Sequence, residues 1–275
     1  MNPVKKAIRA RYGWIPAYEL RNKLRFGHTA LALRRFENAE VRRLASGLPD
    51  GRFPAALVVT VIPTYQRPAL LRAAVLSALD QSVTDQTIVI VDDCGGLPEL
   101  PEDPRLHAVS LSRNVGVPGV SRNIGLRLTD SPFVAFLDDD NLWRPNHLSA
   151  SLARFRDSAH PQPRPDAVYT GMRRVTPEGN EIGRVSVRFD RKLAMSRAFL
   201  DVSTFVMRRS ADVRFSRVRR AKEVMPKEDW ELMFRFSRRH HVEHVPELTV
   251  DYLVNPDSWW TPWEREIHTD QAGRG

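Results

Sequence analysis

Three consecutive aspartates, Asp138-Asp139-Asp140, are the residues of this sequence with the clearest chemical potential. They directly follow Phe133 to Leu137, an apolar stretch that predicts a buried strand. Neighbouring carboxylates repel one another and resist ionisation unless a cation lies among them. Carboxylate oxygens are hard ligands that suit Mg²⁺ or Mn²⁺, and such an ion commonly carries a pyrophosphate. The run therefore predicts a metal-assisted site for a pyrophosphate-containing ligand.

Two further polar clusters follow predicted strands. The stretch Leu57 to Ile62 runs into Pro63-Thr64-Tyr65, and Thr87 to Val91 runs into Asp92-Asp93. Ligands bind beyond the carboxyl ends of strands in open α/β sheets, so we expect the three clusters to converge on one crevice. Each of these two clusters also has a structural interpretation. Pro-Thr-Tyr is an ordinary turn sequence, and an Asp pair can cap a turn or a helix.

Alternating strands and helices must position these clusters. Helices are predicted from about Pro68 and over 120–128, 145–155 and 228–238. Strands are predicted at 57–62, 87–91, 107–111, 133–137, 167–170, 182–187 and 202–206, with short strands over 242–254. The pattern predicts an α/β fold with a Rossmann-like, mostly parallel, doubly wound sheet.

Composition excludes several other classes of protein. Neither GxGxxG nor GxxxxGK[ST] occurs, so phosphate binding must depend on metal and side chains. Cys94 is the single cysteine, which excludes an intramolecular disulfide and a Cys-rich zinc site and fits a reducing compartment. The N-terminus lacks the apolar region of a signal peptide, and no apolar stretch is long enough to span a bilayer. We therefore expect a cytoplasmic protein.

The net charge of +9 is concentrated near the N-terminus, where residues 1–50 hold eleven Lys and Arg residues against four acidic residues. Apolar residues there have helical spacing, and Gly13 and Pro16 are expected to interrupt the first part. Three interpretations stay open. The segment could pack on the body as a solvated helical pair, or bind an anionic membrane surface at the inner face of the membrane. Nucleic acid is the third, but no recognisable reading module is present, so we predict no nucleic-acid partner.

Five motifs occur in a fixed order along the body. They are Val61-Ile62-Pro63-Thr64-Tyr65-Gln66-Arg67, Val89-Ile90-Val91-Asp92-Asp93, Asn114-Val115-Gly116, Ser121-Arg122-Asn123-Ile124-Gly125-Leu126 and Phe136-Leu137-Asp138-Asp139-Asp140-Asn141-Leu142-Trp143. Together they resemble the family 2 glycosyltransferases of the GT-A fold, over about residues 56–255. The resemblance implies an inverting transfer from a nucleoside-diphosphate sugar to a hydroxyl acceptor. UDP is common in the family, while GDP and dTDP stay open.

The resemblance also implies roles for single residues in the first two motifs. Pro63 and Tyr65 would line the nucleobase pocket. Asp93 would hydrogen-bond the base, with Asp92 supporting it. Arg67 is assigned to the same nucleotide-sugar site.

The later motifs would hold the rest of the donor. Arg122 and Asn123 would lie near the ribose and diphosphate. Asp138 and Asp140 match the ends of the family's DxD motif. Asp139 would face the ribose or the donor sugar, and Asp140 would hold Mn²⁺ or Mg²⁺.

The pair Glu228-Asp229 matches the element that carries the catalytic base in this family, and Asp229 is the matching position. An acceptor hydroxyl must lose its proton as it attacks the anomeric carbon, which requires such a base. The leaving nucleoside diphosphate gains charge that a metal ion would stabilise. From the residues alone, two acids also suit the positive end of a helix.

Gly47, Pro49, Gly51 and Pro54 break the chain and separate an extension (1–52) from the body. The resemblance suggests a GT-A catalytic domain (53–265), and a polar, loose tail (266–275) is expected after it. The nucleotide-binding half would cover about 55–143 and the acceptor half about 144–265. The acceptor could be a glycan, a lipid-linked molecule or a small molecule.

The sequence has two alternative interpretations besides an active glycosyltransferase. Asn255 stands where many relatives have a histidine, which leaves open a catalytically degenerate nucleotide-sugar-binding or scaffold protein. A sugar-1-phosphate nucleotidyltransferase needs a glycine-rich, lysine-containing loop after its first strand. Pro63 to Arg67 does not match that loop.

Overall fold

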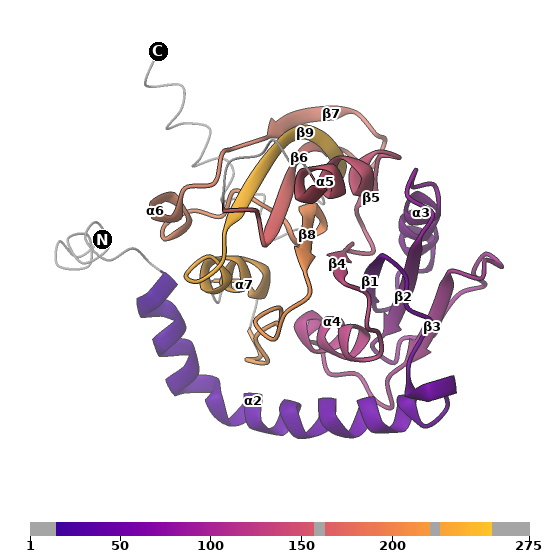
Figure 1. Ribbon diagram of the computed structural model, residues 1–275. Coiled ribbons are helices and arrows are strands. Elements are labelled where there is room, and N and C mark those ends of the chain that lie inside the picture. Colours follow the sequence, from indigo (N-terminus) through magenta and orange to yellow (C-terminus); the bar gives the residue numbers. More distant parts are fainter. Residues whose placement is uncertain (1–14, 157–162, 221–225, 255–275) are drawn as a thin grey trace, which may run out of the picture.

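The computed structural model describes residues 15–156, 163–220 and 226–254, and Figure 1 shows a single curled sheet with helices on both faces. The strands are β1 (Val58–Thr64), β2 (Gln86–Asp92), β3 (Leu106–Ser110), β4 (Phe133–Phe136), β5 (Leu142–Trp143), β6 (Ala167–Val175), β7 (Glu181–Val185), β8 (Phe205–Arg208) and β9 (Val242–Leu253). The helices are α2 (Ile15–Ala45), α3 (Pro68–Leu79), α4 (Pro118–Arg127), α5 (His147–Arg156), α6 (Arg191–Ala194) and α7 (Glu228–Phe236), with 3₁₀ turns η1 (Pro49–Gly51) and η2 (Val202–Thr204).

The first half of the sheet is parallel, in the order β3-β2-β1-β4. Side chains of β1 alternate between two cores: Val59 and Val61 pack with α4, while Val58 and Ile62 pack with α3 and α5. Because both faces are covered, the strand is a continuous apolar run, as expected for buried parallel sheets. The predicted α/β fold with a doubly wound sheet is confirmed.

The strand order creates one special position in this sheet. After β1, the chain adds β2 and β3 on one side and then returns to place β4 on the other side of β1. A crevice opens at such a reversal, beyond the carboxyl ends of the two central strands. Pro63 lies near the end of β1, and Asp138 lies two residues after the end of β4. The fold therefore brings two of the predicted clusters together.

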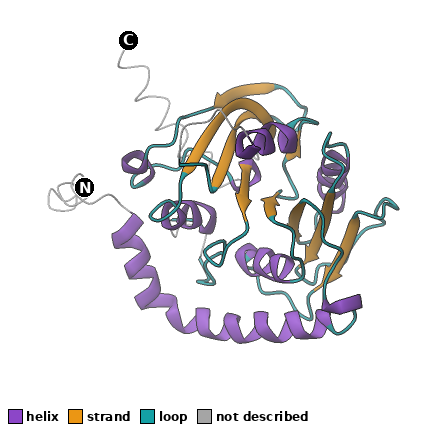
Figure 2. Cartoon of the chain, in the orientation of Figure 1, coloured by secondary structure: helices purple, strands orange, loops and turns teal. Residues whose placement is uncertain are grey.

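The second half of the sheet mixes strand directions (Figure 2). β8 is antiparallel to β4 and β6, β9 is parallel to β6, and the short β5 is antiparallel to β9. Short strands were expected over 242–254, but β9 is one twelve-residue strand that absorbs its irregularities as register shifts opposite Thr170 to Met172. η2 and α7 from this part of the chain lie beside the residues that follow β1 and β4, because the Ser203 hydroxyl accepts a hydrogen bond from the Asp138 amide and Glu228 lines the same cleft as Pro63.

The strand predicted at 202–206 was wrong at its start. Residues Val202–Thr204 form η2, and only Phe205–Arg208 is a strand. The Asp201 carboxylate accepts a hydrogen bond from the Ser203 amide at 2.8 Å, which caps the turn. Asp, Ser and Thr compete in this way with ladder pairing, even within a β-branched sequence.

In the described residues the basic extension forms one long helix, α2, and not the expected helical pair. Pro16 lies in its first turn, where the missing N–H of proline costs nothing, and Gly13 falls outside the described residues. One side of α2 is buried against α4 and α7, and Figure 1 shows the helix running along the rim of the molecule. The interpretation of a segment packed on the body is therefore confirmed for α2, but the segment is a single helix that Pro16 does not interrupt.

The acidic residues of α2 attach it to the body. Glu37 is fully buried and pairs with Arg217 at 2.6 Å and Arg127 at 3.2 Å. Glu19 pairs with Arg220 at 2.9 Å, and the Glu40 carboxylate accepts a hydrogen bond from the Ser112 amide at 2.9 Å. Because these acids face inward, the outer surface of α2 is more basic than its sequence suggests.

Predictions that concern the C-terminal residues lie outside the described part of the chain. They include Asn255 and the loose tail at 266–275. Within the described segments, no helix combines the length and the apolar character that a membrane crossing needs.

Candidate active site

A cleft of about 430 Å³ opens beyond the carboxyl ends of β1 and β4. Its walls include residues from every predicted cluster: Pro63, Tyr65, Arg67, Asp93, Arg122, Asp138, Asp139, Asp140 and Glu228. These residues come from segments up to 165 positions apart, between Pro63 and Glu228. We call this feature the central cleft. It is where the sequence placed a pyrophosphate-containing ligand.

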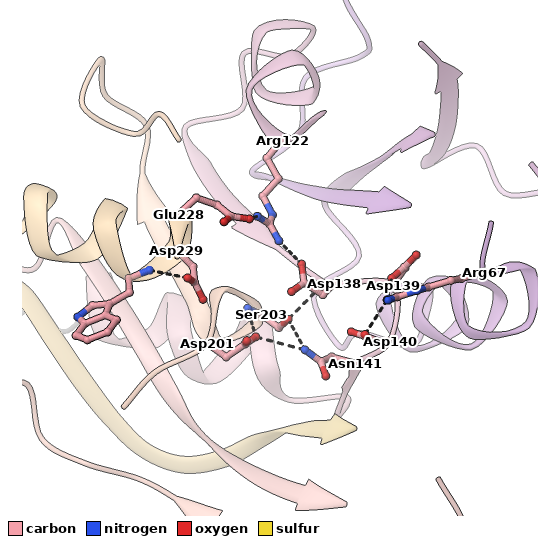
Figure 3. A network of polar contacts seen from close by, with 11 residues as sticks. Arg67, Arg122, Asp138, Asp139, Asp140, Asn141, Asp201, Ser203, Glu228 and Asp229 are labelled. Atoms are coloured by element: carbon pink, nitrogen blue, oxygen red, sulfur yellow. Dashed lines mark hydrogen bonds and ion pairs between the residues drawn. The ribbon is translucent and has the colours of Figure 1, made fainter. Parts of the chain in front are cut away.

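The aspartate run forms the floor of the central cleft and is bound by two arginines (Figure 3). Arg122 pairs with Asp138, while Arg67 pairs with Asp139 at 3.0 Å and Asp140 at 2.8 Å. The Thr64 hydroxyl also donates to Asp139 at 2.7 Å. The turn is thereby fixed to the end of β1 and to α4.

Negative charge remains in excess at this turn. Burial and the carboxylates of Asp138 and Asp139 raise the pKa of Asp140 to about 6, against the opposing effect of Arg67. Burial also raises the pKa of Asp139. An added cation would reduce the repulsion between these carboxylates and favour their ionised form.

Arg122 lies in the second turn of α4 and is buried between two acidic side chains. Its guanidinium pairs with Asp138 and donates to Glu228 at 3.2 Å, and it lies 5.0 Å from the centre of the Phe215 ring. Burial opposes its charge, but the two carboxylates keep the pKa of Arg122 above its ordinary value. Gly125, one turn later, lets α4 approach β1, because a Cβ there would lie 2.6 Å from Val61 Cγ1. The helix therefore presents Arg122 at a fixed depth.

The two aspartates at the end of β2 have different roles. Asp93 lines the central cleft, and its carboxylate accepts hydrogen bonds from the amides of Val115 at 2.8 Å and Gly116 at 2.7 Å. Asp92 is buried and accepts from the amides of Gly95 and Gly96 at 2.8 and 3.2 Å. Asp92 therefore holds the turn that carries Asp93, and it does not reach into the cleft.

Asn123 lies where the sequence-based prediction did not place it. Its side chain donates to the Glu37 carboxylate and to the Phe215 carbonyl, both at 3.1 Å, and accepts from the Phe215 amide at 2.8 Å. These contacts face α2 and the core, away from the cleft. Neighbouring helical residues point about 100° apart, so a motif that directs Arg122 into the cleft directs Asn123 elsewhere. The prediction of a ribose or diphosphate contact is corrected to a structural role.

Asp229 lies in the first turn of α7, next to the acids of the cleft. Its Oδ1 accepts from the Trp230 amide at 2.7 Å, and the Trp230 indole donates to the Ala194 carbonyl at 2.7 Å. Burial and the neighbouring Glu228 raise the pKa of Asp229 to about 6, while the Trp230 amide and Arg122 oppose the rise. Figure 3 shows Asp229 beside Asp201 and Glu228. One of its carboxylate oxygens is thus held by the backbone of its own helix.

A polar network behind the aspartate run was missed by the sequence analysis. Asp201 accepts from Asn141 at 3.3 Å, and the Ser203 hydroxyl accepts from the Asp138 amide at 3.1 Å and from Asn141 at 3.0 Å. The Asn141 side-chain oxygen accepts from the Leu253 amide at 3.1 Å. This network ties the floor of the central cleft to η2 and β9. The capping pattern at Asp201 was visible in the sequence, but its proximity to the aspartates was not.

A parallel half-sheet with an acidic cleft at its strand-order reversal is the arrangement that the predicted GT-A fold requires. The family model for glycosyl transferase family 2 matches residues 59–215, more than half of the chain. The chain belongs to glycosyltransferase family 2, which confirms the resemblance.

Two curated relatives are similar to part of this chain. The chain is 37% identical over 112 residues to succinoglycan biosynthesis protein ExoW of Rhizobium meliloti, a match that covers 36% of this chain and 35% of ExoW. It is 35% identical over 103 residues to the putative teichuronic acid biosynthesis glycosyltransferase TuaG of Bacillus subtilis, covering 35% of this chain and 40% of TuaG. These matches span well under half the length of either relative.

The fold is shared with S. aureus TarS. The structure of TarS 1–349 in complex with UDP-GlcNAc superposes with a TM-score of 0.55 and 18% identity, over 73% of this chain and 59% of that one. The complex of TarS 1–349 with UDP gives a TM-score of 0.52 and 20% identity, over 72% and 61%. At this identity the likeness concerns the fold alone.

Proposed function

We propose that this protein transfers a sugar from a nucleoside-diphosphate sugar, with UDP as the first candidate, to a hydroxyl acceptor with inversion. The observation that carries the proposal is the convergence of Tyr65, Asp93 and the aspartate run on one cleft at the strand-order reversal. The TarS structure with bound UDP-GlcNAc supports a nucleotide-sugar donor on this fold.

The nucleoside would occupy the side of the central cleft formed by the ends of β1 and β2. Pro63 and Tyr65 provide apolar surface there, and Tyr65 is exposed enough to contact a flat base. Asp93 accepts hydrogen bonds from two backbone amides and from the Asn114 side chain, yet a carboxylate has about four lone-pair sites and can accept one more from a base. This side of the cleft would select the nucleotide.

The diphosphate would lie over the aspartate run together with Mn²⁺ or Mg²⁺ on Asp140. The donor set fits such an ion, because carboxylate oxygens are hard ligands and three carboxylates are adjacent here, where burial and the carboxylates of Asp138 and Asp139 raise the pKa of Asp140. The described residues contain no cluster of three or more His, Cys, Asp or Glu side chains arranged to hold a metal. Oxygens of the diphosphate would therefore complete the shell, as is usual for Mg²⁺. When bound, the metal would stabilise the charge of the departing nucleoside diphosphate.

Asp229 would accept the proton of the acceptor hydroxyl. Its carboxylate is held at one oxygen by the Trp230 amide, which leaves the other oxygen for the proton. A pKa of about 6 keeps this group ionised at neutral pH while leaving it basic enough for proton transfer. A base on one side of the anomeric carbon and a leaving group on the other give a single displacement, which inverts the configuration.

Incubation with a panel of UDP-, GDP- and dTDP-sugars tests this function. We expect one donor class to release its nucleoside diphosphate slowly in the presence of Mn²⁺, because water can replace the acceptor hydroxyl. Release is measured by coupled detection of the free nucleotide, with heat-inactivated protein as control. If no panel member is bound or turned over, the degenerate nucleotide-sugar-binding or scaffold alternative becomes the better account.

A further inference from the structure

The outer face of α2 carries a row of leucines in contact with solvent. Leu20, Leu24 and Leu31 are 60%, 79% and 63% exposed, and Leu24 is the most exposed large hydrophobic residue in the part of the chain that the structure describes. Their spacing of four and seven residues places them on one side of a helix. Single exposed leucines are ordinary, but an aligned row on one helix marks a surface for a partner.

Exposed cations surround this row. Arg34 and Arg35 follow Leu31 by three and four residues and so share its side of the helix, while Arg21 and Lys23 flank Leu20 and Leu24. We call this leucine and cation surface the outer face of α2.

All negative charge of α2 lies on its inner side, away from the leucines and from solvent. The three acidic residues of the helix are buried and bound by groups of the body or, for Glu40, also by Arg43 of α2 itself. The outer face is thus a basic amphipathic surface on a helix that is held in place through its acids. Figure 1 shows α2 at the rim of the molecule, with the sheet and the other helices on its inner side.

We propose that the outer face of α2 binds an anionic lipid surface, with the helix in the plane of the interface. Leucines between headgroups and cations beside anionic lipids are the two contributions that such helices combine. A second copy of the chain fits less well, because a self-complementary contact would bring two cationic faces together. The inference rests on α2 alone and does not depend on the proposed donor chemistry.

Vesicle sedimentation of the full chain tests this surface. The probes are phosphatidylcholine vesicles with and without phosphatidylglycerol. We expect binding only to the anionic vesicles, weakened by added salt because charge attraction is screened. The combined variant Leu20→Ser, Leu24→Ser, Leu31→Ser and the variant Arg34→Gln, Arg35→Gln should each weaken binding by about tenfold or more, since both contributions are needed.

Matched controls separate this result from general effects. Leu76→Ser with Ile182→Ser removes apolar residues that are about half exposed elsewhere, and Arg184→Gln removes an exposed cation of β7. Both controls should bind vesicles as the unchanged protein does, and thermal unfolding should show that all variants are folded.

Three outcomes would overturn the inference. The first is vesicle binding that is unchanged in the leucine variant. The second is no binding to the anionic vesicles; a concentration-dependent dimer that the leucine variant abolishes, measured by light scattering, would then assign the surface to a second copy of the chain. The third is binding to a nucleic-acid duplex that needs Arg34 and Arg35 but not the leucines. Calorimetric titration of UDP in the same variants shows separately whether the donor site is intact.

Discussion

Replacing Asp229 by Asn is expected to reduce sugar transfer by about 10²–10⁴-fold, the usual contribution of a general base. Asn has the shape of Asp and can keep the hydrogen bond from the Trp230 amide, so α7 should begin as before. What it lacks is the basic oxygen. We therefore expect kcat to fall while the Kd for the nucleoside diphosphate, measured by calorimetry, changes little.

Glu228 provides the matched comparison for Asp229. It lies one residue earlier and pairs with Arg122 at 3.2 Å. If Glu228 were the base, Glu228→Gln would remove activity and Asp229→Asn would not. Transfer by Asp229→Asn within about threefold of the unchanged protein, against the loss expected for a base, would contradict the assignment of Asp229.

The pH dependence of kcat/KM provides a second test of Asp229 as the base. Asp229 works only as the carboxylate, and its pKa is raised to about 6. As pH falls through this value the base gains a proton, so kcat/KM should drop about tenfold per pH unit below 6 and level off above it. At saturating Mn²⁺, which would keep Asp140 ionised, the residual activity of Asp229→Asn should lack this limb.

Arg122→Met is expected to destabilise the fold by about 3 kcal/mol or more, because breaking a buried ion pair leaves its partners uncompensated. The Arg122 side chain is only 4% exposed and pairs with both Asp138 and Glu228. The change also removes the contact of the guanidinium with the Phe215 ring. Urea unfolding followed by circular dichroism measures the loss.

A double variant and a surface control sharpen this prediction. Adding Glu228→Gln to Arg122→Met should recover part of the loss, since it removes one of the unpaired acids. Arg184→Gln removes an arginine that is 65% exposed and paired with Glu181, and such pairs contribute about 0–1 kcal/mol. A loss below about 1 kcal/mol for Arg122→Met would show that the buried cation does not organise the site.

The parallel half of the fold was predictable because its signals are local. The run at 57–62 is apolar throughout, since both faces of β1 are covered, and polar residues follow where the strand leaves the core. The same logic placed Asp93 and the aspartate run at one crevice. Which of these residues bind donor, metal or acceptor stays a prediction.

The roles of other residues depend on partners far away in the chain, which a single sequence does not reveal. Glu37 looks like a surface residue of a basic helix until Arg217, 180 positions away, is placed beside it. Asn123 follows Arg122 in one motif, but the turn of the helix sends the two side chains in different directions. Asp201 comes close to the aspartate run only because η2 packs behind that turn.

Calorimetric titration of UDP with and without Mn²⁺, in the unchanged protein and in Asp140→Ala, tests the central claim most directly. In sites of this kind, one or two protein carboxylates and the phosphates of the nucleotide together supply the ligands of Mg²⁺ or Mn²⁺. We therefore expect Mn²⁺ to tighten UDP binding by about tenfold or more, and Asp140→Ala to lose that gain while the exposed control Asp80→Ala keeps it. Equal binding of UDP with and without Mn²⁺, or an unaltered gain in Asp140→Ala, would contradict a metal-assisted donor site at the aspartate run.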